Sequence, residues 1–251
     1  MRLARILYGG GPRLARAVAG GYVLDEERVE IAQADAFLLA PSEPTKILAV
    51  GWNFPEHIEE MVARLPTRTF PEKLDEPIIF LKPPSSLVPH LGPIVYPSDA
   101  TRVEHEGELS VVIGARMRRV TPEQAQAGVL GWCCGNDVTE RDMQARDRQW
   151  WRAKGYDTFA PLGPGLETDT PDPDARILTR VNGETRQQGR VRDMIRDPWQ
   201  IIAFVSQAVT LLPGDVIMLG TPPGVGPLVP GDTVEVDIEG VGLLSNAVVA
   251  E

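Results

Sequence analysis

The stretch Val103-Glu-His-Glu-Gly-Glu-Leu-Ser-Val-Val-Ile-Gly114 decides how the rest of the chain is interpreted. Glu104, Glu106 and Glu108 alternate with other residues and lead into an apolar run. Side chains two residues apart lie on the same face of a β-strand. The pattern therefore predicts a strand with a row of carboxylates on one side, and the odd-numbered residues from Leu109 to Ile113 facing a core on the other.

Two interpretations of the carboxylate row are open. Carboxylates in one row repel one another unless a cation lies between them, and a divalent cation that prefers oxygen ligands would neutralise them. A third carboxylate would come from elsewhere, and Asp137 in Gly135-Asn-Asp-Val-Thr-Glu-Arg-Asp142 is the best candidate. The alternative is a solvated outer face of an antiparallel sheet.

Composition limits the function classes. A chain of 251 residues with 43% hydrophobic and 24% charged residues is typical of a globular protein with a sizeable core. The sequence contains no apolar run of about 20 residues and no signal-peptide pattern, which argues against a membrane protein and predicts a cytoplasmic location. A net charge of −10 argues against a nucleic-acid partner. Cys133 and Cys134 are adjacent, which suits neither a disulfide nor a metal pair.

The chain divides into two parts. Residues 1–41 alternate short apolar pieces with turns, which predicts a small, mostly β N-terminal lobe, and residues 42–251 form the larger domain. Within it the pattern predicts strands at 46–51, 78–82, 93–96 and 129–134, a short helix at 122–129 that Thr121 caps, a helix over 139–151 and another near 198–210. The C-terminal third is expected to be rich in strands, with a hairpin turn at Asn182-Gly183. The many Gly and Pro residues, 24 and 23, favour short strands over long helices.

A helix that begins at Pro55 carries the second group of candidate residues. An apolar stripe is expected at Ile58, Met61, Val62 and Leu65. His57, Glu60 and Arg64 would share the opposite face, where residues three apart are in contact. A carboxylate beside an imidazole orients the ring and suits it to be a general base. A surface histidine beside a helix-end glutamate is the alternative.

Two other segments are candidates. Lys154 is one of four lysines among 25 basic residues and lies between aromatic residues, where its ammonium would be partly desolvated or would be a half-buried ion-pair partner. The Gly220–Gly226 loop lacks the Gly-Lys-Ser/Thr of a P-loop, but it offers Thr221 and backbone amides to an anion. The polar segment Pro66–Pro77 is expected to be a long loop, either a lid or disordered.

These pieces, in this order, resemble the fumarylacetoacetate hydrolase family over roughly residues 45–250. The motifs that carry the resemblance are Gly51-x-Asn53-Phe54-x-x-His57-x-x-Glu60-Met61, Lys82-Pro83-Pro84-Ser85-Ser86, Glu106-x-Glu108-Leu109-x-Val111-Val112-Ile113-Gly114, Asn136-Asp137-Val138-Thr139-x-Arg141-Asp142-x-Gln144, Ala153-Lys154-Gly155-x-Asp157-Thr158-Phe159, Val181-Asn182-Gly183-Glu184 and Gly220-Thr221-Pro222-x-Gly224-Val225-Gly226.

The resemblance implies an α+β fold that is mostly β, with a rolled, mixed β-sheet, a few surrounding helices and a homodimeric assembly. It implies that Glu106, Glu108 and Asp137 bind Mg²⁺ or Mn²⁺. His57 with Glu60 would activate water, and Lys154 would donate to charged oxygens of the substrate. The residues implied as substrate contacts are Gln144, Thr221 and, more weakly, Arg141.

The chemistry that the resemblance implies is hydrolysis of a C–C bond in a small 2,4-dioxo acid, an acylpyruvate or fumarylpyruvate, through a metal-stabilised enolate. The same metal site would also suit decarboxylation of oxaloacetate or isomerisation of a hydroxymuconate-type dienoate in aromatic catabolism. A non-catalytic ligand-binding scaffold is the alternative from another class. Trp52 departs from the family pattern, since many relatives carry arginine, leucine or another residue there. An extra metal carboxylate of larger members has no clear counterpart.

Overall fold

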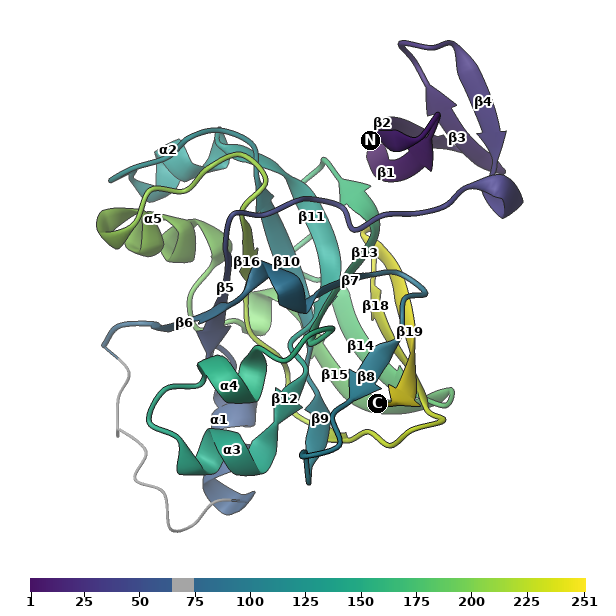
Figure 1. The fold of residues 1–251 in the computed structure, drawn as a ribbon. Helices are drawn as coiled ribbons and strands as arrows, with labels where there is room; N and C mark the ends of the chain where they lie inside the picture. Colours follow the sequence, from purple (N-terminus) through teal and green to yellow (C-terminus); the bar gives the residue numbers. More distant parts are fainter. Residues whose placement is uncertain (65–74) are drawn as a thin grey trace.

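The protein, in a computed structural model, is described over residues 1–64 and 75–251. Most of the loop predicted at 66–77 therefore lies outside the described residues. The described chain folds into three β-sheets surrounded by short helices (Figure 1). The predicted α+β architecture, mostly β and with a mixed sheet, is confirmed.

The largest sheet runs in the order β4-β3-β2-β1-β13-β11-β10-β16-β5-β6, with β7 paired to β13. Its strands are β1 (Arg2–Tyr8), β2 (Gly11–Val18), β3 (Gly21–Leu24), β4 (Val29–Ala32), β5 (Ile47–Gly51), β6 (Ile78–Lys82), β7 (Leu87–Pro89), β10 (Gly107–Ile113), β11 (Val129–Asn136), β13 (Ala160–Glu167) and β16 (Val216–Met218). β10 lies near the middle, antiparallel to β11 and β16, whereas β16 and β5 are parallel. The predicted carboxylate strand is divided at Glu106, because Glu104 lies in β9 (Val103–His105) of another sheet and Glu108 lies in β10, which is central and buried on both faces.

Two smaller sheets complete the β structure. One runs β15-β14-β18-β19-β8 and the other β12-β9-β17. Their strands are β8 (Ile94–Tyr96), β9 (Val103–His105), β12 (Thr139–Glu140), β14 (Arg176–Val181), β15 (Glu184–Arg190), β17 (Gly226–Pro227), β18 (Thr233–Ile238) and β19 (Gly242–Ala250). The main core joins Leu109, Val111 and Ile113 of β10 to apolar residues of β14 and β18. The odd-numbered positions of the carboxylate stretch therefore face the core, as predicted.

The helices of the described chain are short. They are α1 (Pro55–Arg64), α2 (Pro122–Gln126), α3 (Arg141–Arg146), α4 (Trp151–Lys154) and α5 (Pro198–Ala208), with 3₁₀ turns at Gln33–Asp35, Pro84–Ser86 and Val191–Asp193. α2 begins at a capping box on Thr121. The helix predicted within 139–151 is wrong in extent, because the segment forms β12, α3 and the start of α4. Glu140 caps α3, and the extended backbone of Asp147 ends it.

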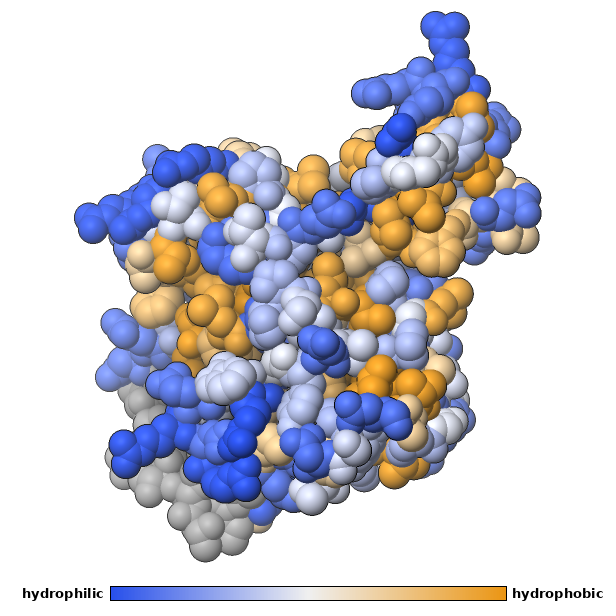
Figure 2. All heavy atoms as spheres, viewed as in Figure 1, coloured by the Kyte–Doolittle hydropathy of each residue, from blue (hydrophilic) through white to orange (hydrophobic). Residues whose placement is uncertain are grey.

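Strands β1 to β4 form the N-terminal end of the large sheet and protrude from the body (Figure 1). β1 joins the body by pairing with β13 at Arg2–Glu167 and Leu3–Leu166. Ile6 and Leu24 are the centre of a separate small core. On the face drawn in Figure 2, hydrophobic residues gather along the side of this lobe that meets the body. None of the described helices is long and apolar enough to cross a membrane.

Candidate metal centre and active site

Glu106, Glu108 and Asp137 form a buried cluster of carboxylates. One oxygen from each lies within 4.8 Å of the others. The three residues expose 4%, 1% and 1% of their surface, and Glu104 exposes none. The interpretation of this row as a solvated outer face is therefore wrong. Burial of several carboxylates together is costly unless cations compensate them.

Strand pairing brings the cluster together. β10 pairs with β11 so that Gly107 lies opposite Asn136, the residue before Asp137. The Asp137 amide donates to the Glu106 carbonyl at 2.8 Å, and the Glu106 amide donates to the Asn136 side chain at 2.9 Å. Glu106 and Asp137, 31 positions apart in the sequence, are thus fixed beside each other by backbone hydrogen bonds.

Two fully buried lysines neutralise part of the cluster. The Lys154 ammonium donates to Glu106 Oε2 at 2.7 Å and to Asp137 Oδ2 at 2.6 Å. Lys82 Nζ donates to Asp137 Oδ1 at 2.6 Å. Lys154 is therefore both desolvated and an ion-pair partner, and it is buried more completely than the half-buried ion pair expected as the alternative. The sequence analysis did not identify Lys82 as a member of this cluster. Lys82 is one of the same four lysines whose scarcity made Lys154 a candidate.

Glu106 and Glu108 differ in their electrostatic surroundings. Burial opposes the charge on Glu106, but Lys154 and Arg141 outweigh it and hold the pKa of that carboxyl well below its usual range. For Glu108, burial and then the charges of Asp137 and Glu106 raise the pKa well above its usual range. The polar partner of the Glu108 side chain is the Gly220 amide, 2.7 Å from Oε2. The cluster retains one carboxylate without a cationic hydrogen-bond partner among the described residues.

This arrangement fits a divalent cation. Three buried carboxylates offer the oxygen ligands that Mg²⁺ and Mn²⁺ prefer. Each oxygen that accepts a hydrogen bond from a lysine keeps a second lone pair. A cation beside Glu108 would also compensate the carboxylate that the lysines leave uncompensated.

Arg141 holds two glutamates of the row in place. Its Nε donates to Glu104 Oε2 at 2.8 Å and its Nη2 to Glu106 Oε1 at 2.7 Å, while Nη1 donates to Gln144 Oε1 at 2.7 Å. Glu104 also pairs with Arg64 and Arg102. Glu104 therefore belongs to an arginine cluster, and the predicted substrate contacts Arg141 and Gln144 contact each other beside the carboxylates.

His57 and Glu60 lie together on α1. His57 Nδ1 is 3.2 Å from Glu60 Oε2, which also accepts from the Gly224 amide at 3.1 Å. Burial opposes the charge on Glu60, but His57 and then the Gly224 amide outweigh it, and its pKa is lowered. Gly224 has a φ of +98°, and a Cβ there would lie 2.1 Å from the Arg186 carbonyl oxygen, so glycine is required for this amide to reach Glu60.

The predicted faces of α1 need a correction. The helix buries His57 and Met61, one turn apart, while Val62 of the expected apolar stripe is 45% exposed. The prediction placed every apolar residue of the stripe against the core. The buried side of α1 also faces a polar site, however, and it holds His57 beside Met61. The alternative of a surface histidine is wrong, because His57 exposes 4% of its surface.

Gln187 is a site residue that sequence reasoning missed. Its Oε1 accepts from the Gly107 amide at 2.9 Å and lies 3.0 Å from His105 Nδ1. Its Nε2 donates to Thr221 Oγ1 and to the Pro222 carbonyl, both at 2.7 Å. Thr221 in turn donates to the Gly107 carbonyl at 2.9 Å. One amide thus connects the backbone between Glu106 and Glu108 to the Gly220–Gly226 loop.

The predicted residues come together around one small cavity of about 10 Å³. Its lining includes His57, Glu106, Glu108, Asp137, Arg141, Gln144, Lys154 and Thr221. Glu60 adjoins it through His57. The cavity volume is about the space that a single water molecule needs, so the site is closely packed in the described structure.

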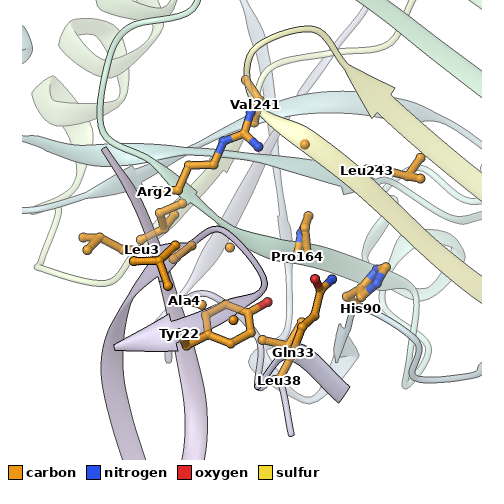
Figure 3. A pocket seen from close by; sticks show the side chains of 16 residues that line it. Arg2, Leu3, Ala4, Tyr22, Gln33, Leu38, His90, Pro164, Val241 and Leu243 are labelled. Atoms are coloured by element: carbon orange, nitrogen blue, oxygen red, sulfur yellow. The ribbon is translucent and has the colours of Figure 1, made fainter. Parts of the chain in front are cut away.

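A larger cavity of about 400 Å³ lies elsewhere, between the N-terminal lobe and strands β13 and β19 (Figure 3). Arg2, Tyr22 and His90 line it among mostly apolar residues. Arg2 donates to the Gly240 carbonyl, and His90 Nδ1 accepts from the Ser245 amide. This cavity lacks the carboxylates and lysines that give the other one its chemistry.

Comparison with known proteins identifies a matching family model, similar proteins and similar solved structures. Residues 46–249 match the family model described as fumarylacetoacetate (FAA) hydrolase C-terminal. The human mitochondrial oxaloacetate tautomerase FAHD2A is 40% identical over 232 residues, covering 87% of this chain and 71% of the relative. The structure of a 5-carboxymethyl-2-hydroxymuconate delta-isomerase from Mycobacterium smegmatis is 39% identical with a TM-score of 0.88, and the match covers 100% of both chains.

A third comparison includes a metal and a ligand. The maleylpyruvate hydrolase from Sphingobium sp. SYK-6, solved in complex with manganese(II) and pyruvate, is 29% identical with a TM-score of 0.82. The match covers 100% of this chain and 99% of that one. Proteins similar to this chain therefore include a tautomerase, an isomerase and a hydrolase.

Proposed function

This chain belongs to the fumarylacetoacetate hydrolase family, and from that premise we propose that it is a divalent-metal-dependent hydrolase. Its substrate would be a small 2,4-dioxo acid of the acylpyruvate type, cleaved at the bond between C3 and C4. The observation that carries the proposal is the buried His57–Glu60 pair beside the carboxylate cluster, because a general base is needed to activate water.

The metal would be Mg²⁺ or Mn²⁺, held by Glu106, Glu108 and Asp137. When bound, it supplies positive charge for the carboxylate and 2-oxo oxygens of the substrate. Support comes from the three buried carboxylates and from the manganese in the related maleylpyruvate hydrolase.

The proton transfers are assigned to His57 and Glu60. With Nδ1–H donating to Glu60, the Nε2 atom of His57 is left as the base that takes a proton from water. The resulting hydroxide adds to the C4 carbonyl. The C3–C4 bond then breaks, its electron pair moves toward the 2-oxo oxygen, and protonation at C3 yields pyruvate. Water and one acylpyruvate thus give one carboxylic acid and one pyruvate.

Lys154, Gln144 and Thr221 would hold the substrate. Lys154 is charged at neutral pH, since Asp137 and Glu106 outweigh its burial and raise its pKa, and it would donate to the developing negative charge on oxygen. Arg141 occupies the Oε1 acceptor of Gln144, so the amide NH₂ of Gln144 would be the group that meets a ligand.

The test is an assay of acetylpyruvate, fumarylpyruvate and oxaloacetate side by side with Mg²⁺, with products identified by mass. Pyruvate plus a second acid from an acylpyruvate supports the proposal. Carbon dioxide from oxaloacetate alone would replace it with decarboxylation, and turnover of only a hydroxymuconate-type dienoate would replace it with isomerisation.

We propose in addition that the protein is a homodimer, as the family resemblance implies. Large apolar side chains of the N-terminal lobe support an interface, since Leu7, Leu14 and Phe37 are 48%, 55% and 63% exposed in the single chain. Light scattering after size-exclusion chromatography tests this, and a mass of one chain would refute it.

A further inference from the structure

Glu104 is the member of the glutamate row that the proposed metal site does not use. It lies on β9, outside the carboxylate cluster, and exposes none of its surface. A fully buried carboxylate needs partners that compensate its charge. Glu104 pairs with three arginines, since Oε1 contacts Arg64 and Arg102 and Oε2 contacts Arg141. The position of Glu104 therefore fixes three cations beside the site.

Two of these arginines lead from Glu104 in different directions. Arg141 connects Glu104 to the carboxylate cluster, because its Nε donates to Glu104 Oε2 at 2.8 Å and its Nη2 to Glu106 Oε1 at 2.7 Å. Arg64 is at the C-terminal end of α1. Its Nη2 donates to Glu104 Oε1, and its Nη1 donates to the Val225 carbonyl at 3.0 Å. Glu104 thus joins the carboxylate cluster to the end of α1.

Arg64 has another acceptor within reach on its own helix. Glu60 precedes it by four residues, the spacing at which a glutamate and an arginine pair on a helix surface. In the structure Arg64 Nη1 is 3.7 Å from Glu60 Oε1, which is too far for a hydrogen bond. The other oxygen, Glu60 Oε2, lies 3.2 Å from His57 Nδ1. Arg64 is thus turned toward Glu104 and Val225, and Glu60 contacts His57 without a hydrogen bond from this guanidinium.

We propose that Glu104 is a positioning residue for the general base, because it holds Arg64 away from Glu60 and leaves the charge of Glu60 to His57. This inference rests on the proposed function, since it explains how the base of that reaction is kept ready. Without the negative charge of Glu104, Arg64 would turn to Glu60 and form the ordinary ion pair of a helix surface. Glu60 would then support a protonated His57 less well, and proton removal from water would be slower.

Glu104→Gln tests this, because it keeps the size of the side chain and removes its charge. The amide oxygen can still accept from Arg141, whereas the NH₂ group would face Arg64 and cannot accept from it. We expect kcat for acetylpyruvate to fall about tenfold, less than the roughly 10²–10⁴ lost with the whole base. KM, and the Kd of Mn²⁺ measured by calorimetry, should stay within about threefold of the wild type. Arg102→Gln is the matched control, since the half-exposed Arg102 side chain also pairs with Glu104, and it should leave kcat unchanged.

A second substitution distinguishes positioning from a general structural role. If Arg64 is the group that disturbs Glu60, its removal should restore activity to Glu104→Gln. We expect kcat of the double variant Glu104→Gln/Arg64→Gln to exceed that of Glu104→Gln by at least about threefold, whereas independent defects would add. The double variant should also match Arg64→Gln within about threefold, a comparison that does not require Glu104→Gln alone to fold. A double variant at least about tenfold slower than Arg64→Gln, or an Arg102→Gln protein as slow as Glu104→Gln, would overturn the inference.

A measurement without turnover separates this inference from the proposed function. The chain has three histidines, so the His57 ring can be followed by NMR of protein labelled with ¹⁵N-histidine and assigned with His57→Ala. We expect the Nδ1 proton of His57, which donates to Glu60, to move upfield in Glu104→Gln and to return toward its wild-type position in the double variant. An unmoved proton in folded Glu104→Gln would overturn the inference and leave the hydrolase function intact. If the wild type hydrolyses no acylpyruvate, the proposed function fails, and the proton shift still decides whether Glu104 positions His57.

Discussion

At the scale of single residues, His57 is expected to act in the reaction and not in metal binding. It contacts Glu60 and is not part of the carboxylate cluster. His57→Ala should lower kcat by about 10²–10⁴, the usual contribution of a general base. Its affinity for Mn²⁺, measured by calorimetry, should stay within about twofold of the wild type, a change below about 0.5 kcal/mol. Glu106→Ala is the contrasting variant and should lose metal affinity. Wild-type turnover by His57→Ala would remove the dyad from the mechanism.

Gln187 allows a second prediction at this scale. Gln187→Leu would remove the side-chain partner of the buried Gly107 amide and of the Pro222 carbonyl, at about 1–3 kcal/mol for each group. We expect a lower free energy of unfolding and weaker Mn²⁺ binding, since Gly107 lies between Glu106 and Glu108. The neighbouring Gln188 is exposed, so Gln188→Leu should change stability by less than about 0.5 kcal/mol. Equal effects of the two variants on stability and Mn²⁺ binding would contradict the role of Gln187 in connecting Gly107 to the Gly220–Gly226 loop.

Some residues could be identified from the sequence because their signal is local. Glu106 directly precedes β10 and Glu108 lies two residues on, within it, and His57 and Glu60 are three apart on α1, so the spacing already suggests each pair. Gln187 lacks such a signal, since the other residues of its strand are exposed or half-buried and its partners are 34 to 82 positions away. The contacts of Lys82 with Asp137 likewise depend on the order of strands in the sheet.

At the scale of elements, two turns with similar sequences differ in what their aspartates contact. Leu212-Pro-Gly-Asp215 and Val229-Pro-Gly-Asp232 each use the aspartate to accept from the amide three residues earlier, at 2.8 Å. Asp215 is buried and also contacts Thr45 and the Lys46 ammonium, whereas Asp232 is half-buried and contacts Asn182. The Lys46–Asp215 ion pair holds the start of β5 beside the start of β16.

We therefore expect Asp215→Asn to lower the free energy of unfolding by about 3 kcal/mol, as for other broken buried ion pairs. Asp232→Asn, the matched control, should cost about 1 kcal/mol. Chemical denaturation at neutral pH measures both. If the two variants lose the same stability, the burial of Asp215 has no special role.

The contribution of Asp215 should depend on pH. Burial opposes its charge, but Lys46 and Thr45 outweigh it, and the pKa of Asp215 is lowered on folding. A group with a lowered folded pKa stabilises fully above its unfolded pKa of about 3.9 and loses that stabilisation as pH falls through the folded value. The difference between wild type and Asp215→Asn should be constant near neutral pH and shrink below about pH 4.

Elements were predicted best where a capping or turn signal supported the hydrophobic pattern. Thr121 marks the start of α2, and Asn182-Gly183 marks the hairpin between β14 and β15, where both residues have positive φ. The segment 139–151 was misjudged because its helical pattern continues across Asp147, while capping by Glu140 and the extended backbone at Asp147 divide it. These are local capping and backbone features that hydrophobic periodicity does not encode.

At the scale of the whole molecule, the carboxylate cluster makes stability depend on metal. A ligand that binds only the folded chain at about 100 times its Kd adds about 2.7 kcal/mol. For a chain of this size Mn²⁺ should raise Tm by about 5–10 °C, and EDTA should reverse the shift. Glu108→Gln is the control, because it removes a ligand while relieving repulsion with Asp137 and Glu106, so it should fold but show no shift. An unchanged wild-type Tm in saturating Mn²⁺ would contradict the metal assignment.

The central claim, hydrolysis of a C–C bond, is tested most directly by isotope transfer from water. Acetylpyruvate is incubated with the protein and Mg²⁺ in water enriched in ¹⁸O, and the products are followed by mass over short times. We expect acetate and pyruvate in equal amounts, with ¹⁸O from the attacking water in the acetate carboxylate, and their formation at least about 10²-fold slower with His57→Ala. Consumption of acetylpyruvate without acetate, or acetate formed at the same rate by His57→Ala, would contradict it.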